Sequence, residues 1–430
     1  MSETRTIEVG YLARVEGEGS LRATVIDGEL GEIEFNIFEP PRFFEGIMRG
    51  RRYTEAPDIT ARICGICPVA YQTSSIKAME DACGVDVTGQ LHELRRLIYC
   101  GEWIESHALH IYLLHAPDFL GYDSGIAMAA DHRAVVEQGL RLKQTGNEIV
   151  RVLGGREIHP VNMRVGGFWR LPTSAELLGL ATELDRARDE AVETVKWVSQ
   201  LSFPDVTKPV EMVALSNSDR YPFTEGRIKS TGGIDIDVSE WNDVFVETHV
   251  ERSNALHATV RERGTYAVGP TARFALNHEV IHPAAARAAA DAGLEPGVAN
   301  PFKSIIVRAV ETLHAVEESL AIIDAYEPPP AATIPVEPIA GIGHGVSEAP
   351  RGLLYHQYEI ADDGKILDAQ IVPPTSQNQL SIEEDLREVL QANLEKPDED
   401  LQWLLEQTIR NYDPCISCAT HFLRLEIDRG

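Results

Sequence analysis

The chain has 430 residues, 43% hydrophobic and 25% charged, and its 67 Asp and Glu outnumber its 39 Lys and Arg, for a net charge of −28. This composition is typical of a globular protein and excludes collagen-like, disordered and membrane-embedded chains. A surface this acidic repels phosphate backbones, so we expect no nucleic-acid partner. No stretch approaches the roughly 20 apolar residues of a membrane helix, and the first residues form no apolar signal segment. We therefore expect a cytoplasmic protein without a membrane span.

The predicted elements change character along the chain. Alternating apolar residues around a turn at Asp27-Gly28 predict strands within 5–38. After Pro41 the periodicity becomes helical, and we expect seven helices, at 69–83, 90–115, 127–153, 175–200, 239–263, 302–325 and 381–409. The proline-rich segment 327–338 predicts an extended connector, and 353–373 returns to strand-like alternation. The expected fold class is α+β, mainly helical.

Four of the six cysteines form two Cys-x-x-Cys pairs at opposite ends of the chain, Cys64 with Cys67 and Cys415 with Cys418. Together they offer four thiolates, which suit zinc, an iron–sulfur centre or another soft-ligand metal. The pairs are too far apart in sequence for a local zinc ribbon. If they act together, the two ends of the chain must meet, which argues against independent domains. The remaining cysteines, 83 and 100, are expected to be small buried hydrophobes.

Other candidate residues have ordinary structural interpretations when each is taken alone. Glu16, in a glycine-flanked loop, is typical of a solvated turn carboxylate. Glu45 is typical of an acid in the first turn of a helix. The glycine-rich run 341–345 lacks a P-loop lysine and predicts a close backbone passage, not a phosphate cradle. Three histidines on one predicted helix are expected to be hydrogen-bonded core residues and not zinc ligands: His107, His110 and His115.

The segments around the cysteine pairs resemble the two signature motifs of the nickel–iron hydrogenase large subunit. They are 62–67 (Arg-Ile-Cys-Gly-Ile-Cys) and 413–421 (Asp-Pro-Cys-Ile-Ser-Cys-Ala-Thr-His). Five further segments match the family in order, at 14–17, 107–112, 154–167, 269–273 and 348–352. The resemblance implies that family's fold, with a central helix bundle and small peripheral antiparallel sheets.

The resemblance also implies a single domain over residues 1–430. Its parts would be an N-terminal β segment at 5–38, a helical body at 42–326, and a C-terminal part at 339–421 that closes the metal site. Residues 422–430 would be a removable C-terminal peptide, cut off after His421 by a maturation protease.

Carried over residue by residue, the resemblance implies a nickel–iron centre whose iron bears carbon monoxide and cyanide. Cys64 and Cys415 match the terminal nickel thiolates, and Cys67 and Cys418 match the thiolates that bridge nickel and iron. A second metal, magnesium or iron, is implied near the end of the chain. Its ligands would be Glu45, His421 and the backbone carbonyl of Leu367.

The same match implies roles around the metals. Glu16 corresponds to the proton-relay carboxylate, Arg351 to the guanidinium over the open face of the metals, and Cys415 can accept a proton from H2. Splitting so weak an acid needs a Lewis acid with a base beside it, which soft metals and their thiolates provide. The implied pocket around the diatomic ligands consists of Pro350, Arg351, Leu354, Val372, Pro373 and Thr375.

The chain has no nucleotide motif and no ferredoxin-like cysteine cluster, so electrons must leave through another polypeptide. The resemblance implies an iron–sulfur small subunit, flavin-bearing diaphorase subunits that reduce NAD(P), and nickel chaperones besides the protease. Three departures from many relatives resemble the cytoplasmic, sulfhydrogenase-like branch: Tyr71 replaces a histidine, Ser106 an aspartate and Pro374 a serine. Heterodisulfide, sulfur or polysulfide acceptors and a hydrogen sensor are the alternatives. A complex I-type subunit is less favoured, because such subunits lack the four cysteines.

Overall fold

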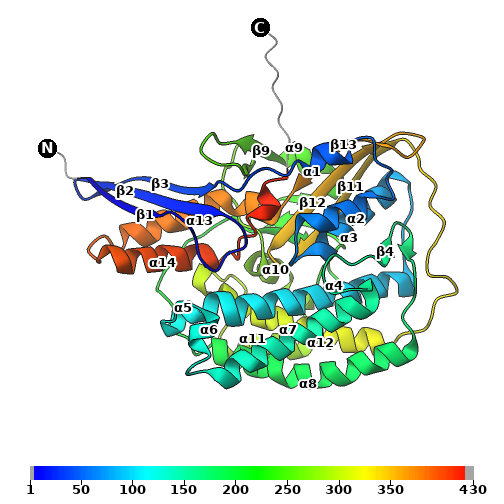
Figure 1. The fold of residues 1–430 in the computed structure, drawn as a ribbon, viewed down its shortest axis with the longest axis horizontal. Helices are drawn as coiled ribbons and strands as arrows, with labels where there is room; N and C mark the ends of the chain where they lie inside the picture. Colours follow the sequence, from blue (N-terminus) through cyan, green and yellow to red (C-terminus); the bar gives the residue numbers. More distant parts are fainter. Residues whose placement is uncertain (1–3, 422–430) are drawn as a thin grey trace, which may run out of the picture.

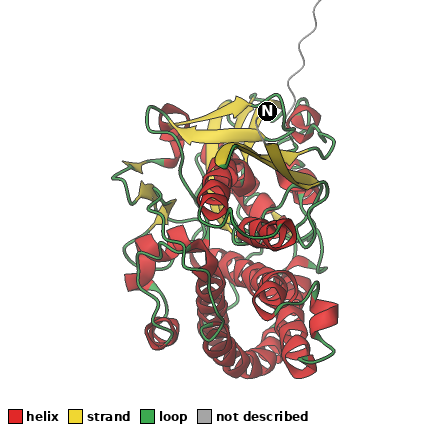
Figure 2. Cartoon of the chain, turned by 90° about the vertical axis from the view of Figure 1, so that its left-hand side faces the viewer, coloured by secondary structure: helices red, strands yellow, loops and turns green. Residues whose placement is uncertain are grey.

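A computed structural model describes residues 4–421 and shows a layer of helices beneath a β-rich layer (Figure 1). Figure 2 shows the same division from the side, with the long helices below and the larger sheets above. The long helices of the lower layer are α4 (Gly89–Leu109), α7 (Arg133–Gly154), α8 (Ser174–Val198) and α12 (Ser304–Asp324). Short helices flank them: α5 (Ala116–Leu120), α6 (Gly125–Met128) and α11 (Pro283–Asp291). The predicted mainly helical α+β class is confirmed.

Helix α4 is the centre of the bundle and packs against α7 and α12. Its residues are buried on almost every side, as its nearly continuous apolar sequence predicted. Two glycines let α4 and α7 approach closely, since a Cβ at Gly146 would lie 2.5 Å from the carbonyl oxygen of Gly101. The helix then continues as a π-helix over His110–His115.

The upper layer contains two three-stranded antiparallel meanders. The first, β1 (Thr4–Val9), β2 (Gly19–Ile26) and β3 (Glu29–Ile37), packs on α13 (Pro374–Gln391) and α14 (Asp398–Arg410). The second consists of β11 (Gly341–Ala349), β12 (Gly352–Ile360) and β13 (Ile366–Val372). It packs on α3 (Pro68–Ala82), with α1 (Phe44–Met48) and α2 (Ala56–Thr60) nearby.

Strand β11 carries the glycine-rich run across the backbone of α3. A Cβ at Gly343 would lie 2.0 Å from the carbonyl oxygen of Ala78, and one at Gly345 would lie 2.2 Å from that of Ser74. Only glycine permits so close a contact between strand and helix. The predicted close backbone passage is confirmed.

The helix predicted at 239–263 is wrong. The segment holds one short helix, α9 (Trp241–Val244), and a hairpin of β9 (Phe245–His249) and β10 (Leu256–Val260). β-branched and aromatic residues favour strands, and the turn is fixed from outside, because Asn254 N–H donates to the carbonyl of Ile37 at 2.7 Å. A tertiary contact therefore determines the secondary structure of this segment, whose hydrophobic periodicity is ambiguous.

Two further helix boundaries differ from prediction. The single helix expected at 381–409 is divided into α13, which begins earlier at Pro374 and ends at Gln391, and α14, which Pro397 precedes as the N-cap residue. The helix expected from residue 127 begins only at Arg133, after the separate α6.

The expected helical body at 42–326 also contains small sheets. One is β4 (Met163–Arg164) with β5 (Gly167–Phe168), and another is β6 (Val213–Ser216), β7 (Arg227–Ser230) and β8 (Asp235–Ile236). The same region includes α10 (Pro270–Asn277).

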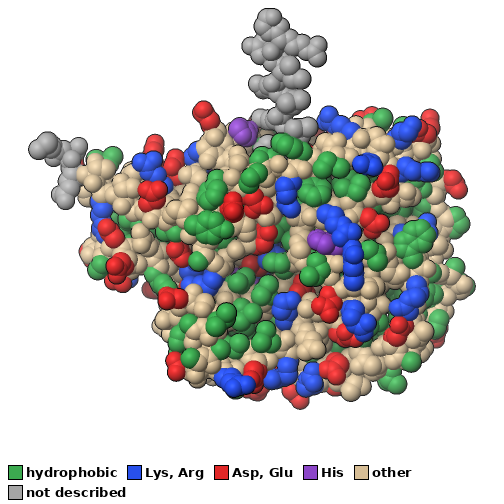
Figure 3. Space-filling model, viewed as in Figure 1, with side chains coloured by type: hydrophobic (Ala, Val, Ile, Leu, Met, Phe, Trp, Pro, Cys, Tyr) green, Lys and Arg blue, Asp and Glu red, His purple; other side chains and the backbone are tan. Residues whose placement is uncertain are grey.

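On the face shown in Figure 3, acidic and basic side chains are interspersed with hydrophobic ones. Within residues 4–421, none of the helices has the length and apolar character needed to cross a bilayer. The predicted removable peptide, 422–430, lies outside the described residues.

Candidate metal centre

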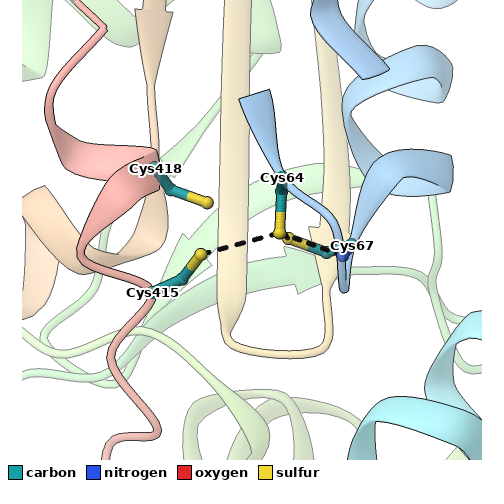
Figure 4. Close-up of side chains that lie close together, drawn as sticks. All are labelled: Cys64, Cys67, Cys415 and Cys418. Carbon is teal, nitrogen blue, oxygen red and sulfur yellow. Dashed lines mark hydrogen bonds between the residues drawn. The ribbon is translucent and has the colours of Figure 1, made fainter. Parts of the chain in front are cut away.

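Both Cys-x-x-Cys pairs meet in the interior (Figure 4). Cys64 and Cys67 lie at the start of α3, while Cys415 and Cys418 lie in the C-terminal loop and its single 3-10 turn. The four sulfur atoms all lie within 4.8 Å of one another, and every one of these side chains is buried. Cys64 Sγ is 3.6 Å from Cys415 Sγ and 2.7 Å from Cys67 Sγ. The structure therefore gathers four potential thiolate ligands into one site.

The pKa values of the four thiols shift in different directions. Burial disfavours every thiolate, but hydrogen bonds from the other cysteines, with help from Arg351, lower the pKa of Cys64 well below its usual value. Burial raises the pKa of the other three thiols: Cys67, Cys415 and Cys418. Four thiols this close can all ionise only when a cation supplies compensating charge. The donor set fits one or two soft metals and not a hard ion such as calcium.

Glu16 lies against the C-terminal cysteine loop and not in a solvated turn. Its Oε2 accepts hydrogen bonds from Cys415 Sγ at 3.1 Å and from Ser417 N–H at 3.0 Å, and its carbonyl accepts from Ile416 N–H at 2.8 Å. The neighbouring Gly17 has φ 91°, and a Cβ there would lie 2.7 Å from the Ile416 Cβ. The Glu-Gly dipeptide thus places one carboxylate directly beside a cysteine sulfur.

Arg351 occupies the turn between β11 and β12 and is buried, with 3% of its surface exposed. Its Nε donates to the Asp413 carbonyl at 2.7 Å and one Nη to the Asp413 carboxylate at 3.2 Å. Burial alone would lower its pKa, but Asp413 and the cysteine thiolates raise it above its ordinary value. The side chain is therefore a fixed cation beside the four sulfurs, and within residues 4–421 its Nη1 has no hydrogen-bond partner. Asp413 begins the second cysteine motif, but no local sequence pattern indicates that it binds Arg351.

The other residues of the implied ligand pocket have different relations to the four cysteines. Thr375 Oγ1 accepts from the Cys415 N–H at 3.0 Å, at the start of α13, which Pro373 precedes. Leu354 belongs to the same apolar cluster as the four cysteines, whereas Val372 belongs to the neighbouring one. Pro350 offers its carbonyl to two buried guanidinium groups at 3.2 Å each, those of Arg273 and Arg308.

A second polar site lies at the end of the described chain. His421 Nε2 is 3.5 Å from Glu45 Oε1, and its Nδ1 contacts the Cys418 carbonyl at 2.7 Å. The backbone of Ile371 lies between them, since its N–H donates to Glu45 Oε1 at 2.8 Å and its carbonyl oxygen contacts His421 Nε2. These atoms could hold a divalent cation, because carboxylate, imidazole and carbonyl groups are all metal ligands.

This geometry corrects the carbonyl expected from Leu367. That residue stands four positions earlier in β13 with 51% of its surface exposed. Four residues displace a strand carbonyl by about 13 Å. The packing of β13 against α1, which no local sequence pattern reveals, therefore places the carbonyl of Ile371 and not that of Leu367 beside Glu45 and His421.

A buried ionic network that the sequence did not reveal supports the turn that carries Arg351. Arg273 donates to Glu311 at 2.7 Å, to Glu348 at 3.2 Å and to the Ala349 carbonyl at 2.8 Å. His107 Nε2 contacts Glu311 at 3.0 Å, and burial lowers the pKa of His107 to about 4. Burial raises the pKa of Glu348 to about 7.

The histidines of α4 and the following π-helix are core residues, as expected. Within residues 4–421, no cluster with metal-ligand geometry includes them. His110 contacts the Arg410 carbonyl at 2.8 Å, whereas neither ring nitrogen of His115 has a hydrogen-bond partner among residues 4–421. The Nδ1 atoms of His107 and His110 also lack a partner among these residues, so the expected hydrogen bonds form at one ring nitrogen of each of these two histidines and at neither nitrogen of His115.

Comparison with known proteins gives one consistent result. The profile of the nickel-dependent hydrogenase family matches residues 42–138 and 258–421. Sulfhydrogenase 1 subunit alpha of Pyrococcus furiosus is 33% identical over 428 residues, covering 97% of this chain and 98% of that protein. NAD-reducing hydrogenase HoxS subunit beta of Cupriavidus necator is 28% identical, covering 98% and 95%. The structure of an NAD+-reducing nickel–iron hydrogenase in its H2-reduced state matches with a TM-score of 0.90 at 27% identity, covering 97% of this chain and 99% of that one.

Proposed function

The chain belongs to the nickel-dependent hydrogenase family as a catalytic large subunit, and we propose that it oxidises H2 reversibly in the cytoplasm and delivers the electrons to NAD or NADP. The observation that carries the reaction is the group of four buried thiols with the Glu16 carboxylate beside one of them. The likeness to a sulfhydrogenase subunit and to an NAD-reducing enzyme supports the acceptor.

In this proposal the four cysteines would hold the nickel–iron centre, with Cys64 and Cys415 as ligands of nickel alone and Cys67 and Cys418 as ligands that nickel and iron would share. The iron would also carry carbon monoxide and cyanide. When bound, the metals supply the Lewis acid that polarises H2. The chain's own residues then handle the proton. Cys415 Sγ is the first base, and Glu16 Oε2, 3.1 Å away, takes the proton onward.

Arg351 positions the other face of the site. Asp413 holds two of its donor groups, which leaves Nη1 free among residues 4–421 to donate to a polar ligand such as cyanide. The proposed pocket around the diatomic ligands also includes Pro350, Leu354, Val372, Pro373 and Thr375. Glu45, His421 and the Ile371 carbonyl are the proposed ligands of the magnesium or iron.

The electrons require partners, because the metal site is buried and the chain carries no second redox motif. We propose an iron–sulfur small subunit, a flavin-bearing diaphorase module, and a maturation protease with nickel chaperones. Since the site joins both ends of the sequence, the proposed domain is the whole chain.

Purified complex, analysed for nickel and iron and assayed under H2, tests the function. We expect near one nickel and one catalytic iron per large subunit, and reduction of NADP or NAD. Hydrogen uptake with heterodisulfide or polysulfide, and none with nucleotides, would instead favour the alternative acceptors. Metal loading with negligible turnover would favour a sensor.

Proteolytic maturation is proposed after His421. The structure already places His421 against Glu45, with the Glu45 N–H 3.4 Å from the His421 carbonyl. Cleavage here would make this closed arrangement permanent by removing the attached peptide. Intact mass of the active subunit checks this: a chain ending at His421 is expected, and a fully active chain ending at Gly430 would contradict it.

A further inference from the structure

Helix α3 begins at the metal centre, because Cys67 is its N-cap residue. The first N–H groups of a helix have no partner within the helix and must be bound from outside it. A serine, threonine or aspartate at the N-cap usually does this with its own side chain. Cys67 does not, since its sulfur belongs to the group of four and, within residues 4–421, its side chain makes no capping hydrogen bond.

The N–H groups at this end of α3 all have a place in the structure. The Cys67 N–H donates to Cys64 Sγ at 3.0 Å, a contact drawn in Figure 4. Pro68 is the first residue of the helix and has no N–H group. The N–H groups of residues 69 and 70 remain, and both donate to a single carboxyl group on α4.

This carboxyl group is the side chain of Glu102. Val69 N–H donates to its Oε2 at 2.6 Å, and Ala70 N–H donates to its Oε1 at 3.0 Å. Glu102 is 1% exposed, while Val69 and Ala70 are fully buried, so solvent cannot replace the carboxyl group as their acceptor. Glu102 therefore does from a neighbouring helix what an N-cap side chain does locally.

Opposing effects act on the charge of Glu102. Burial and the nearby Glu105 raise its pKa, whereas the two backbone hydrogen bonds lower it. A carboxyl group keeps accepting oxygen atoms in both protonation states, so Glu102 can bind the end of α3 in either state.

Helix α4 also binds the segment that carries Arg351. Trp103, the residue after Glu102, donates from its Nε1 to the carbonyl of Glu348 at 2.9 Å. Arg351 follows three residues later, in the turn between β11 and β12. Adjacent residues of one helix thus bind the segment that starts at Cys67 and the segment that carries the buried guanidinium.

We propose that Glu102 is a positioning residue of the metal centre, which holds the first turn of α3 and thereby sets the direction of Cys67 Sγ. The inference rests on the proposed function, in which nickel and iron would share this sulfur. Without the carboxyl group, two buried N–H groups lose their acceptor, and the first turn must shift or unwind to find others. Because Cys67 directly precedes that turn, its sulfur moves with it.

Hydrogen exchange of the assembled enzyme measures the cap directly. In Glu102→Met, which introduces an apolar side chain of similar length, the amides of residues 69 and 70 should exchange roughly tenfold faster. Glu102→Gln keeps one accepting oxygen and should give a smaller increase. Glu80→Gln is the matched control, because Glu80 is equally buried on α3 itself but binds Arg95, and it should leave both amides protected.

The metal centre gives a second readout. Glu102→Met should lower the nickel content about tenfold. Glu102→Gln should retain more nickel but still shift the infrared bands of the carbon monoxide and cyanide on iron. Glu80→Gln should keep the wild-type nickel content and the wild-type bands, even where its melting temperature falls.

The outcomes separate this proposal from the proposed function. Unchanged amide exchange or unchanged bands in the Glu102 variants, or the same changes in Glu80→Gln, would overturn the positioning role. Glu102→Gln carries the test by itself where Glu102→Met does not assemble. Wild-type enzyme without nickel and without these bands would instead refute the proposed function, whereas amide exchange is measured on the polypeptide and does not depend on it.

Discussion

Glu16 Oε2 lies 3.1 Å from Cys415 Sγ, although the two residues stand 399 positions apart in the chain. The contact forms because the loop before β2 and the last loop of the chain run side by side as a short parallel bridge, Glu16 with Cys415. A carboxylate within hydrogen-bond reach of a sulfur that can accept a proton is the geometry that a proton relay requires.

Removing the basic carboxylate of Glu16 should affect H2-driven turnover and hydrogen exchange to different extents. Glu16→Gln keeps the shape of the side chain, so the metals should stay bound, but H2-driven turnover should fall about a hundredfold. Exchange between para and ortho hydrogen needs no proton release to solvent and should fall much less. The half-buried neighbour Glu18, changed to Gln, serves as the control. Equal loss of both reactions would argue against the relay.

Removing a thiolate should remove the metal. Cys415→Ala leaves three sulfurs, and we expect loss of nickel below about a tenth of the wild-type content together with loss of turnover. Cys83→Ala is the matched control, because Cys83 is a buried free cysteine outside the group of four sulfurs. Elemental analysis of both purified variants measures how much nickel each one retains. Nickel retained at wild-type level by Cys415→Ala would contradict the assignment.

Replacing Gly17 should disturb the metal site through a steric clash, in addition to the strain of its positive φ. Gly17→Ala and Gly28→Ala both place a Cβ at positive φ, 91° and 80°, which costs about 1–2 kcal/mol in each. At Gly28 the Cβ meets open space, whereas at Gly17 it would lie 2.5 Å from a Glu39 oxygen and 2.9 Å from Ser417 N. Only Gly17→Ala should therefore displace the cysteine loop and lower nickel content. Similar nickel content in the two variants would show that the close contact has no effect.

His257 should make the fold sensitive to acid. Burial lowers its pKa from 6.5 to about 4, so between these pH values the unfolded chain binds a proton that the folded chain does not. Its stabilising contribution is complete above pH 6.5 and is lost as the pH falls toward 4. At pH 5 the loss is about 2 kcal/mol, or roughly 2 °C of melting temperature for a chain of this size.

The comparison is with His257→Gln, which does not titrate. The melting temperature of the wild type, relative to this variant, should be lower at pH 5 than at pH 7.5. The same difference between the two proteins at both pH values would show that His257 titrates normally in the folded state.

The sequence by itself determined the family, the fold class and the four thiols, because these follow from local motifs that the chemistry of a soft metal fixes. It also predicted the buried helix α4 and the close passage of 341–345, where unbroken apolar sequence and repeated glycine allow few alternatives.

Only the tertiary structure decided features that depend on distant partners. The hairpin β9–β10 replaces a predicted helix because residue 254 is fixed by the end of β3. Ile371 replaces Leu367 beside His421 because the packing of β13 on α1 sets which carbonyl reaches the site. Asp413 gains its significance from burial and from its ion pairs with Arg351 and Arg308, and these arise only when segments far apart in the sequence pack together.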